Sequence, residues 1–318
     1  DHKVQERFGE VRPDLLQYRT CQSALTKLDY LSNDLGINCV SLMPITESGE
    51  EHDWGYTIRH FFSIQSTYGK SSDLKQLIDE CHLRHIRVIF DAVCNHCNAD
   101  CPLYKIDPTS YFYWKEPHHP EGPKDEIWGP EFNYEEKEQS PAWNYMTDVI
   151  QYYIREFHID GLRFDASKQI ANPDVLRHFD QISKDLISKE FNGKPFYTIA
   201  EYIPATSEIT RPNGPLDSVW RNIFFTLEEQ FKKPDEFKID KLKRLINPKD
   251  AEMYETSERC VIYYASHDQE RIMRIFGNMK YSDDEASKRY KFSMIILLTA
   301  IGVPMYYMGD EFGQSNEQ

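Results

Sequence analysis

The 318-residue chain contains no long apolar run. Its longest candidate, Met294 to Ile301, falls far short of the roughly 20 residues that a membrane-spanning helix needs. The chain also opens with no charged-then-apolar leader, so we expect any targeting segment to have been removed or never to have existed. These absences predict a protein that stays in water and has no membrane partner.

Basic side chains are outnumbered by acidic ones. The chain has 37 Lys and Arg against 52 Asp and Glu, which gives a formal net charge of −15. Such a charge repels the phosphate backbone of nucleic acids, so nucleic acid is not the expected partner. A neutral substrate suits this chain better.

Cysteine is sparse, and its seven residues are an odd number that excludes complete disulfide pairing. Cys39 and Cys260 lie within apolar runs, where a small buried thiol is the ordinary interpretation. The pattern favours a reducing compartment, and therefore the cytoplasm over a secreted location.

Three cysteines gather in one short segment. Cys94, Cys97 and Cys101 lie close to His96, and together they offer a dense group of candidate metal ligands. Unlinked loop thiols, or one pair oxidised to a disulfide, explain the same pattern. Because no complete ligand spacing is present, we expect no metal at this cluster.

Short apolar runs alternate with longer amphipathic ones, which is typical of β/α units around a parallel sheet. The apolar faces of the amphipathic runs, such as Leu74, Leu77, Ile78 and Cys81, should cover the sheet. Seven strands are predicted, at residues 38–43, 86–93, 159–164, 196–200, 218–220, 261–265 and 303–308.

This succession predicts an α/β fold, a (β/α)8 TIM barrel over residues 1–318 whose first strand lies within residues 3–11. A doubly wound open sheet is the alternative. Too few residues follow the last strand for a closing helix, so we expect the final helix and flanking domains to be missing from this chain. Residues 97–141 show no sustained periodic pattern. They predict a subdomain-like insertion after strand 3, the strand at residues 86–93.

Polar side chains follow four of the predicted strands. Because the carboxyl ends of all strands meet at one face of a barrel, residues far apart in sequence should converge there. The residues concerned are Asp91, Asn95, His96, Arg163, Asp165, Glu201, His267 and Asp268.

Arg163 and Asp165 are two residues apart, so an extended strand places both side chains on one face. An arginine beside an aspartate stabilises the carboxylate and lowers its pKa, which suits a nucleophile. Glu201 follows an apolar run, where desolvation favours the protonated acid. One ionised and one protonated carboxyl are what retaining cleavage of a glycosidic bond requires.

Each of these residues also has a structural interpretation. An acidic residue after a strand is often a helix cap or a solvated loop group, and a single histidine is more often structural than catalytic. The joint placement at successive strand ends, without a serine or cysteine nucleophile signature, favours acid/base catalysis on a substrate with a poor leaving group.

At these positions the chain resembles glycoside hydrolase family 13, the α-amylase family. The four sequence signatures of that family occur in order, as Asp91 to His96, Gly161 to Asp165, Glu201, and His267 with Asp268. Flanking segments around Trp54, Gly69 and Gly302 also match, so the resemblance covers residues 22–313.

The resemblance implies a nucleophile at Asp165, a general acid/base at Glu201, and a third carboxylate, Asp268, that holds sugar hydroxyls. It implies substrate binding by Tyr56, His96, Arg163, Lys168 and His267, with Asp91 and Asn95 as supports behind them. Stacking of Tyr56 under a sugar ring is physically reasonable, although a tyrosine in such a turn is also a common core residue.

The family contains several activities, so the resemblance leaves the reaction open. Lys168 looks like a lysine of hydrolytic α-amylases, although a solvated helix lysine is an equal interpretation. The segments at Trp128 and Gln269 look more like branching or trehalose-releasing members, whereas Glu201-Tyr202-Ile203-Pro204 favours hydrolysis. We expect α-1,4 hydrolysis of an α-glucan, with a 1,4-α-glucan branching enzyme and a catalytically inert amylase-like module as alternatives.

No cofactor is required for the expected reaction. Many family members bind structural calcium, and Asn95, Asp100 and Asp107 supply hard oxygen atoms of the right kind. The surrounding cysteine-rich loop is atypical of the family, so the sequence leaves open whether calcium binds.

Overall fold

The computed structural model describes residues 20–49, 54–108, 112–114, 128–135, 141–233, 238–248 and 254–315. The chain divides into two compact units, Asp1–Glu201 and Tyr202–Gln318, here called the N-terminal and C-terminal units. The strand predicted within residues 3–11 lies outside the described residues.

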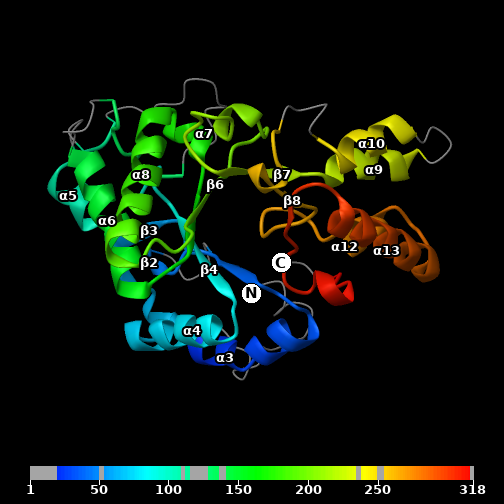
Figure 1. Cartoon of the computed structure of the whole chain (residues 1–318), viewed down its shortest axis with the longest axis horizontal. Helices are drawn as coiled ribbons and strands as arrows, with labels where there is room; N and C mark the ends of the chain where they lie inside the picture. Colours follow the sequence, from blue (N-terminus) through cyan, green and yellow to red (C-terminus); the bar gives the residue numbers. More distant parts are fainter. Residues whose placement is uncertain are drawn as a thin grey trace. The chain divides into compact units, whose positions relative to one another are not determined.

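The N-terminal unit contains a parallel four-stranded sheet (Figure 1). Its strands, in spatial order, are β1 (Cys39–Leu42), β4 (Arg87–Ala92), β5 (Gly161–Phe164) and β6 (Tyr197–Ala200). All four were predicted from their apolar runs. β5 and β6 approach so closely that a Cβ atom on Gly161 would lie 2.3 Å from the carbonyl oxygen of Tyr197, which explains the glycine there.

Helices connect these strands. α4 (Ser71–Leu83), α6 (Pro141–Phe157) and α8 (Pro173–Glu190) are the long ones, and α6 lies beside α8 in Figure 1. α4 buries the predicted apolar face of Leu74, Leu77, Ile78 and Cys81. The shorter helical segments are α3 (Cys21–Leu25), η1 (Tyr30–Asp34), η2 (Ser66–Tyr68), α5 (Pro102–Ile106) and α7 (Ser167–Ile170).

An antiparallel hairpin, β2 (Thr46–Ser48) with β3 (Ile58–Ile64), was not predicted. β2 is only three residues long and its register with β3 shifts twice, so neither strand carries a clean alternating pattern. The hairpin holds the turn that contains Tyr56.

The described parts of residues 97–141 contain α5 and two isolated bridges, His96 to Glu131 and Tyr113 to Phe132. The rings of Tyr113 and Phe132 stack with their centroids 4.9 Å apart. The insertion after strand 3 as a separate subdomain stays a prediction.

The C-terminal unit contains three parallel strands, β7 (Ser218–Asn222), β8 (Cys260–Tyr263) and β9 (Val303–Pro304). β9 is much shorter than the predicted strand at residues 303–308. The helical segments are η3 (Ser207–Ile209), α9 (Phe224–Lys232), α10 (Ile239–Ile246), η5 (Ser257–Arg259), α12 (Ile272–Asn278), α13 (Asp283–Thr299) and η6 (Asp310–Phe312). Across the described ranges of both units, no helix is long and apolar enough to cross a membrane.

Candidate active site

The parallel register of the N-terminal sheet brings the site residues together. Asp91 of β4 pairs directly with Arg163 of β5, and Phe164 pairs with Ala200 of β6. Asp165 and Glu201 are therefore the next residues on two adjacent strands. Their backbone N–H groups continue the ladder, since Asp165 donates to Ala92 O at 3.1 Å and Glu201 donates to Phe164 O at 3.0 Å.

Arg163 connects the three carboxyl groups. Its Nη1 atom lies 2.6 Å from Asp91 Oδ2 and 2.8 Å from Asp165 Oδ1. Its Nη2 atom lies 2.9 Å from Glu201 Oε2, an ion pair by distance. The guanidinium is 1% exposed, so water screens these interactions weakly.

The Asp165 and Glu201 carboxyl groups also contact each other directly. The negative charge of Glu201 and its hydrogen bond with Asp165 both add to the raised pKa of Asp165. Glu201 Oε2 accepts a further hydrogen bond from Ala166 N at 3.0 Å. Ala166 has a φ of 46°, a left-handed conformation that turns its N–H toward Glu201.

Burial raises the pKa of Asp165 well above its ordinary value, and the positive charge of Arg163 opposes this shift without cancelling it. The expectation that Arg163 lowers the net pKa of Asp165 is therefore wrong. The physical reason is burial of the carboxyl group, to which the negative charges of Glu201 and Asp91 add.

Burial likewise raises the pKa of Asp91, against the charge and hydrogen bonds of Arg163. Three ionised carboxylates beside one arginine leave two uncompensated negative charges in a buried space. Retention of a proton within the cluster relieves that cost, and the proton belongs to the interacting groups jointly.

Tyr56 is fixed at the edge of this cluster. Its hydroxyl donates to Asp91 Oδ2 at 2.7 Å, and Arg163 Nη1 lies 3.3 Å from the same hydroxyl. The preceding Gly55 has a φ of 92°, and a Cβ atom there would lie 2.6 Å from Pro44 O. Only glycine suits this position, which explains the Trp-Gly-Tyr turn.

His96 and Asn95 follow β4 and are buried at 1% and 3% exposure. Burial lowers the pKa of His96 to about 4, and the Tyr56 backbone opposes this in part. Asn95 Nδ2 has no hydrogen-bond partner among the described residues. The neutral His96 ring packs against Trp128 with centroids 5.7 Å apart.

Lys168 lies on α7, three residues after Asp165, and its side chain is partly buried. His267 and Asp268 lie in the C-terminal unit, in the segment between β8 and α12. His267 Nε2 is 3.3 Å from Asp268 Oδ1, and the Asp268 side chain is 41% exposed. An exposed carboxylate next to a buried imidazole is suited to hydrogen-bonding a polar ligand.

Sequence reasoning missed a buried ion pair in the C-terminal unit. Arg271 Nη1 lies 3.2 Å from Asp310 Oδ1, and its guanidinium stacks 4.6 Å from the centroid of Tyr307. This pair joins the segment that carries Asp268 to η6. The sequence does show an arginine three residues after Asp268. Its partner lies 39 residues further along the chain, so no local pattern connects the two.

Calcium binding near Asn95, Asp100 and Asp107 stays a prediction. Asp100 is exposed and pairs with Lys105 Nζ at 2.5 Å. Within the described ranges, no three His, Cys, Asp or Glu side chains form a group that could hold a metal ion.

The family model of the alpha-amylase catalytic domain matches residues 20–193 and 129–318. These overlapping matches cover all but the first residues, and the chain belongs to the α-amylase family. The family predicted from the four signatures is thereby confirmed.

Several characterised proteins are similar to this chain. It is 25% identical to a malto-oligosyltrehalose trehalohydrolase of Saccharolobus solfataricus, over 93% of this chain and 55% of that protein. It is 26% identical to an oligo-1,6-glucosidase of Heyndrickxia coagulans, over 92% of this chain and 62% of that protein. It is 28% identical to a 1,4-alpha-glucan branching enzyme of Picrophilus torridus, over 96% of this chain and 44% of that protein. The chain thus spans about half the length of these relatives.

The fold is shared with a solved α-amylase. The crystal structure of alpha-amylase from Geobacillus thermoleovorans, complexed with acarbose, superposes with a TM-score of 0.78 at 22% identity. The match covers 94% of this chain and 66% of that chain. The predicted (β/α)8 class is confirmed by this likeness.

Proposed function

We propose that the chain is a retaining α-glucan hydrolase that cleaves α-1,4-glucosidic bonds through a covalent glycosyl-enzyme intermediate. One observation carries this proposal: Arg163 holds both Asp165 and Glu201, which lie at the ends of adjacent strands. A neutral glucan suits the net charge of −15.

In the proposed first step, Asp165 Oδ attacks the anomeric carbon while Glu201 gives its proton to the glycosidic oxygen. The bond from the anomeric carbon to that oxygen breaks, and the leaving sugar departs as an alcohol. In the second step, Glu201 removes a proton from water, whose oxygen displaces Asp165 from the anomeric carbon. Two displacements restore the original configuration.

The fixed partners of the two carboxyl groups support this division of labour. Arg163 Nη1 lies next to Asp165 Oδ1, so ionised Asp165 keeps a charged hydrogen bond. Glu201 Oε2 accepts from the N–H of Ala166, which leaves the other carboxyl oxygen to act on the glycosidic oxygen.

The remaining roles follow the family resemblance. Tyr56 would stack under the sugar ring, and His96, neutral at physiological pH, would donate to or accept from a sugar hydroxyl. The resemblance also gives His267 and Asp268 the role of holding sugar hydroxyls, and Lys168 that of contacting the leaving-group side.

A branching enzyme is the second candidate, because the relative from Picrophilus torridus is one. In that reaction a sugar hydroxyl, in place of water, takes the glycosyl group from Asp165. Chromatography of the products from amylose separates the two. Short free oligosaccharides with new reducing ends are expected, whereas new α-1,6 branch points without new reducing ends would support branching.

Glu201→Gln tests the proposed acid/base. The variant keeps the shape of the side chain but loses the transferable proton, so turnover should fall on the order of a hundredfold or more while substrate binding persists. Glu190→Gln on α8 is a matched control, because Glu190 is exposed and pairs with Arg155. Unchanged turnover in Glu201→Gln would remove Glu201 from the mechanism.

A further inference from the structure

Two cysteines of the segment after β4 lie in a tight turn beside a surface pocket. Cys97 N donates to Pro130 O at 3.0 Å, and Cys101 N donates to Asn98 O at 2.9 Å. The second bond closes a turn that folds Cys101 back toward Cys97. The backbone therefore fixes the spacing of the two thiols.

The two thiols contact each other. Cys97 and Cys101 are joined by a side-chain hydrogen bond, and Tyr113 Oη lies 4.0 Å from Cys101 Sγ. Both cysteines are free, and they are 0% and 1% exposed. Disulfide formation would bring the two sulfur atoms to a bond length of about 2.05 Å.

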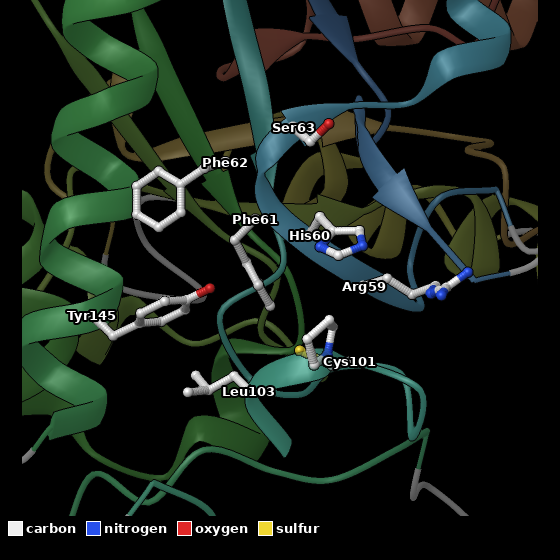
Figure 2. Close-up of a pocket in the computed structure, with 9 residues that line it drawn as sticks. Arg59, His60, Phe61, Phe62, Ser63, Cys101, Leu103 and Tyr145 are labelled. Carbon is white, nitrogen blue, oxygen red and sulfur yellow. The ribbon is translucent and has the colours of Figure 1, made fainter. Parts of the chain in front are cut away.

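Cys101 also lines a pocket of about 430 Å³ on the N-terminal unit (Figure 2). The other lining residues are Arg59, His60, Phe61, Phe62, Ser63, Pro102, Leu103 and Tyr145. The pocket has room for small molecules, while the low exposure of Cys101 limits contact with the sulfur to small reactants.

Cys94 differs from this pair although it belongs to the same segment. It lies two residues after the end of β4. Burial, together with the negative charges of Asp165 and Asp91, raises the pKa of its thiol. A protonated thiol reacts slowly with oxidants. Cys94 thus differs from Cys101, whose thiol pKa is lowered.

We propose that Cys97 and Cys101 form an oxidisable thiol pair, which closes to a disulfide when a peroxide reaches Cys101 through the pocket. This role for the cysteine cluster differs from metal binding, and the glycosidase chemistry does not use it. It does not depend on the proposed hydrolase function.

The reaction balances with one peroxide. The Cys101 thiolate attacks one oxygen of hydrogen peroxide, which breaks the O–O bond, forms a sulfenic acid and releases hydroxide. Cys97 Sγ then attacks Cys101 Sγ and displaces the second oxygen as water, after protonation. Two thiols are oxidised to one disulfide, and the peroxide is reduced to two waters.

The surroundings of Cys101 support it as the first to react. The hydrogen bond from Cys97 lowers the pKa of Cys101 to about 6 against the effect of burial, and the N–H groups of Tyr104 and Leu103 and the Tyr113 hydroxyl assist. The partner thiol, Cys97, has a raised pKa because it donates that hydrogen bond. One thiolate beside one thiol is the arrangement that disulfide closure uses.

A single tryptic peptide tests the proposal, because residues 88–105 contain Cys94, Cys97 and Cys101 and are bounded by Arg87 and Lys105. The folded chain is treated with hydrogen peroxide, quenched, denatured, labelled with N-ethylmaleimide and digested. We expect this peptide to carry one label, on Cys94, and to have lost two hydrogen atoms. Reduction before labelling should restore three labels.

Variants locate the bond. Cys94→Ala should still form the disulfide, whereas Cys101→Ala should leave Cys97 as a labelled thiol after the same treatment. Three labels on the oxidised wild-type peptide would overturn the proposal. A bridge that includes Cys94, or a sulfinic acid without any disulfide, would overturn it equally.

Discussion

Arg163 Nη1 lies 2.8 Å from Asp165 Oδ1, and the same nitrogen lies 2.6 Å from Asp91 Oδ2. Arg163 thus holds the carboxyl group of Asp165, which follows it on the chain, next to that of Asp91 on the neighbouring strand. Because Arg163 is 1% exposed, neither interaction is replaced by water when one partner is removed. The position of Asp165 is set by this network as a whole.

Arg163→Lys should abolish the network while keeping a positive charge. A lysine lacks the planar fork that reaches Asp91, Asp165 and Glu201 together, so buried carboxylates lose their partner. We expect activity on a glucan to fall roughly 100- to 1,000-fold and the free energy of unfolding to fall by about 3 kcal/mol. Denaturant unfolding and kcat/KM check the two effects, and wild-type kcat/KM would contradict the network's role.

Tyr56→Phe should test the hydroxyl separately from the ring. The variant keeps the aromatic surface but removes the donor to Asp91 Oδ2. We expect kcat/KM to fall by about tenfold, because about 1.4 kcal/mol of a charged hydrogen bond is lost. Tyr152→Phe on α6 is the control, and equal effects of both substitutions would argue against a special role for Tyr56.

Asp160 lies at the other end of β5 and provides a stability test that avoids the site. Its carboxylate accepts from Val88 N at 2.8 Å, lies 2.7 Å from His82 Nε2 and pairs with Lys194 Nζ at 3.1 Å. Burial favours a raised pKa, but these partners outweigh it and lower the pKa of Asp160. Asp160 therefore stabilises the fold above its unfolded pKa, and this contribution is lost as the pH falls through the lowered value.

Asp160→Asn should reduce the free energy of unfolding at pH 7 by about 2–3 kcal/mol, because charged hydrogen bonds are lost. Activity of the folded fraction should be unchanged. Urea unfolding at pH 7 and at pH 3 checks this, since the difference from wild type should shrink at the lower pH. A constant difference at both pH values would contradict the assigned charge.

Asp310 should show the opposite pH dependence. Burial raises the pKa of Asp310 from 3.8 to about 6, although Arg271 opposes the shift. The folded state binds this proton more tightly than the unfolded state, so the stabilising contribution is present below about pH 4 and lost as the pH rises through about 6. The loss should amount to on the order of 2–3 kcal/mol.

Asp310→Asn removes this titration. Breaking the pair with Arg271 should make the variant less stable at every pH, but its disadvantage should be smaller at pH 7 than at pH 4. Thermal or urea unfolding at the two pH values measures the difference. A disadvantage that grows with pH would show that Asp310 is ionised throughout the range and has a lowered pKa.

The sequence predicted the strands of the N-terminal unit and placed the candidate site residues at their ends, because both depend on local patterns. Apolar runs located β4, β5 and β6, and the register of a parallel sheet then placed Asp165 beside Glu201. The pKa of Asp165 could not be predicted, since it depends on how many carboxyl groups share Arg163. The β2–β3 hairpin, with its irregular register, gave no periodic signal.

Trapping with a mechanism-based fluoroglycoside, read by mass spectrometry, tests the central claim most directly. Tryptic cleavage after Arg163 and Lys168 isolates the segment Phe164 to Lys168, whose only carboxylate side chain is Asp165. We predict one fluoroglycosyl group on this segment, on Asp165, and none in Asp165→Asn. No label on the folded chain, under conditions that label a known α-amylase, would contradict the account and favour an inert amylase-like module.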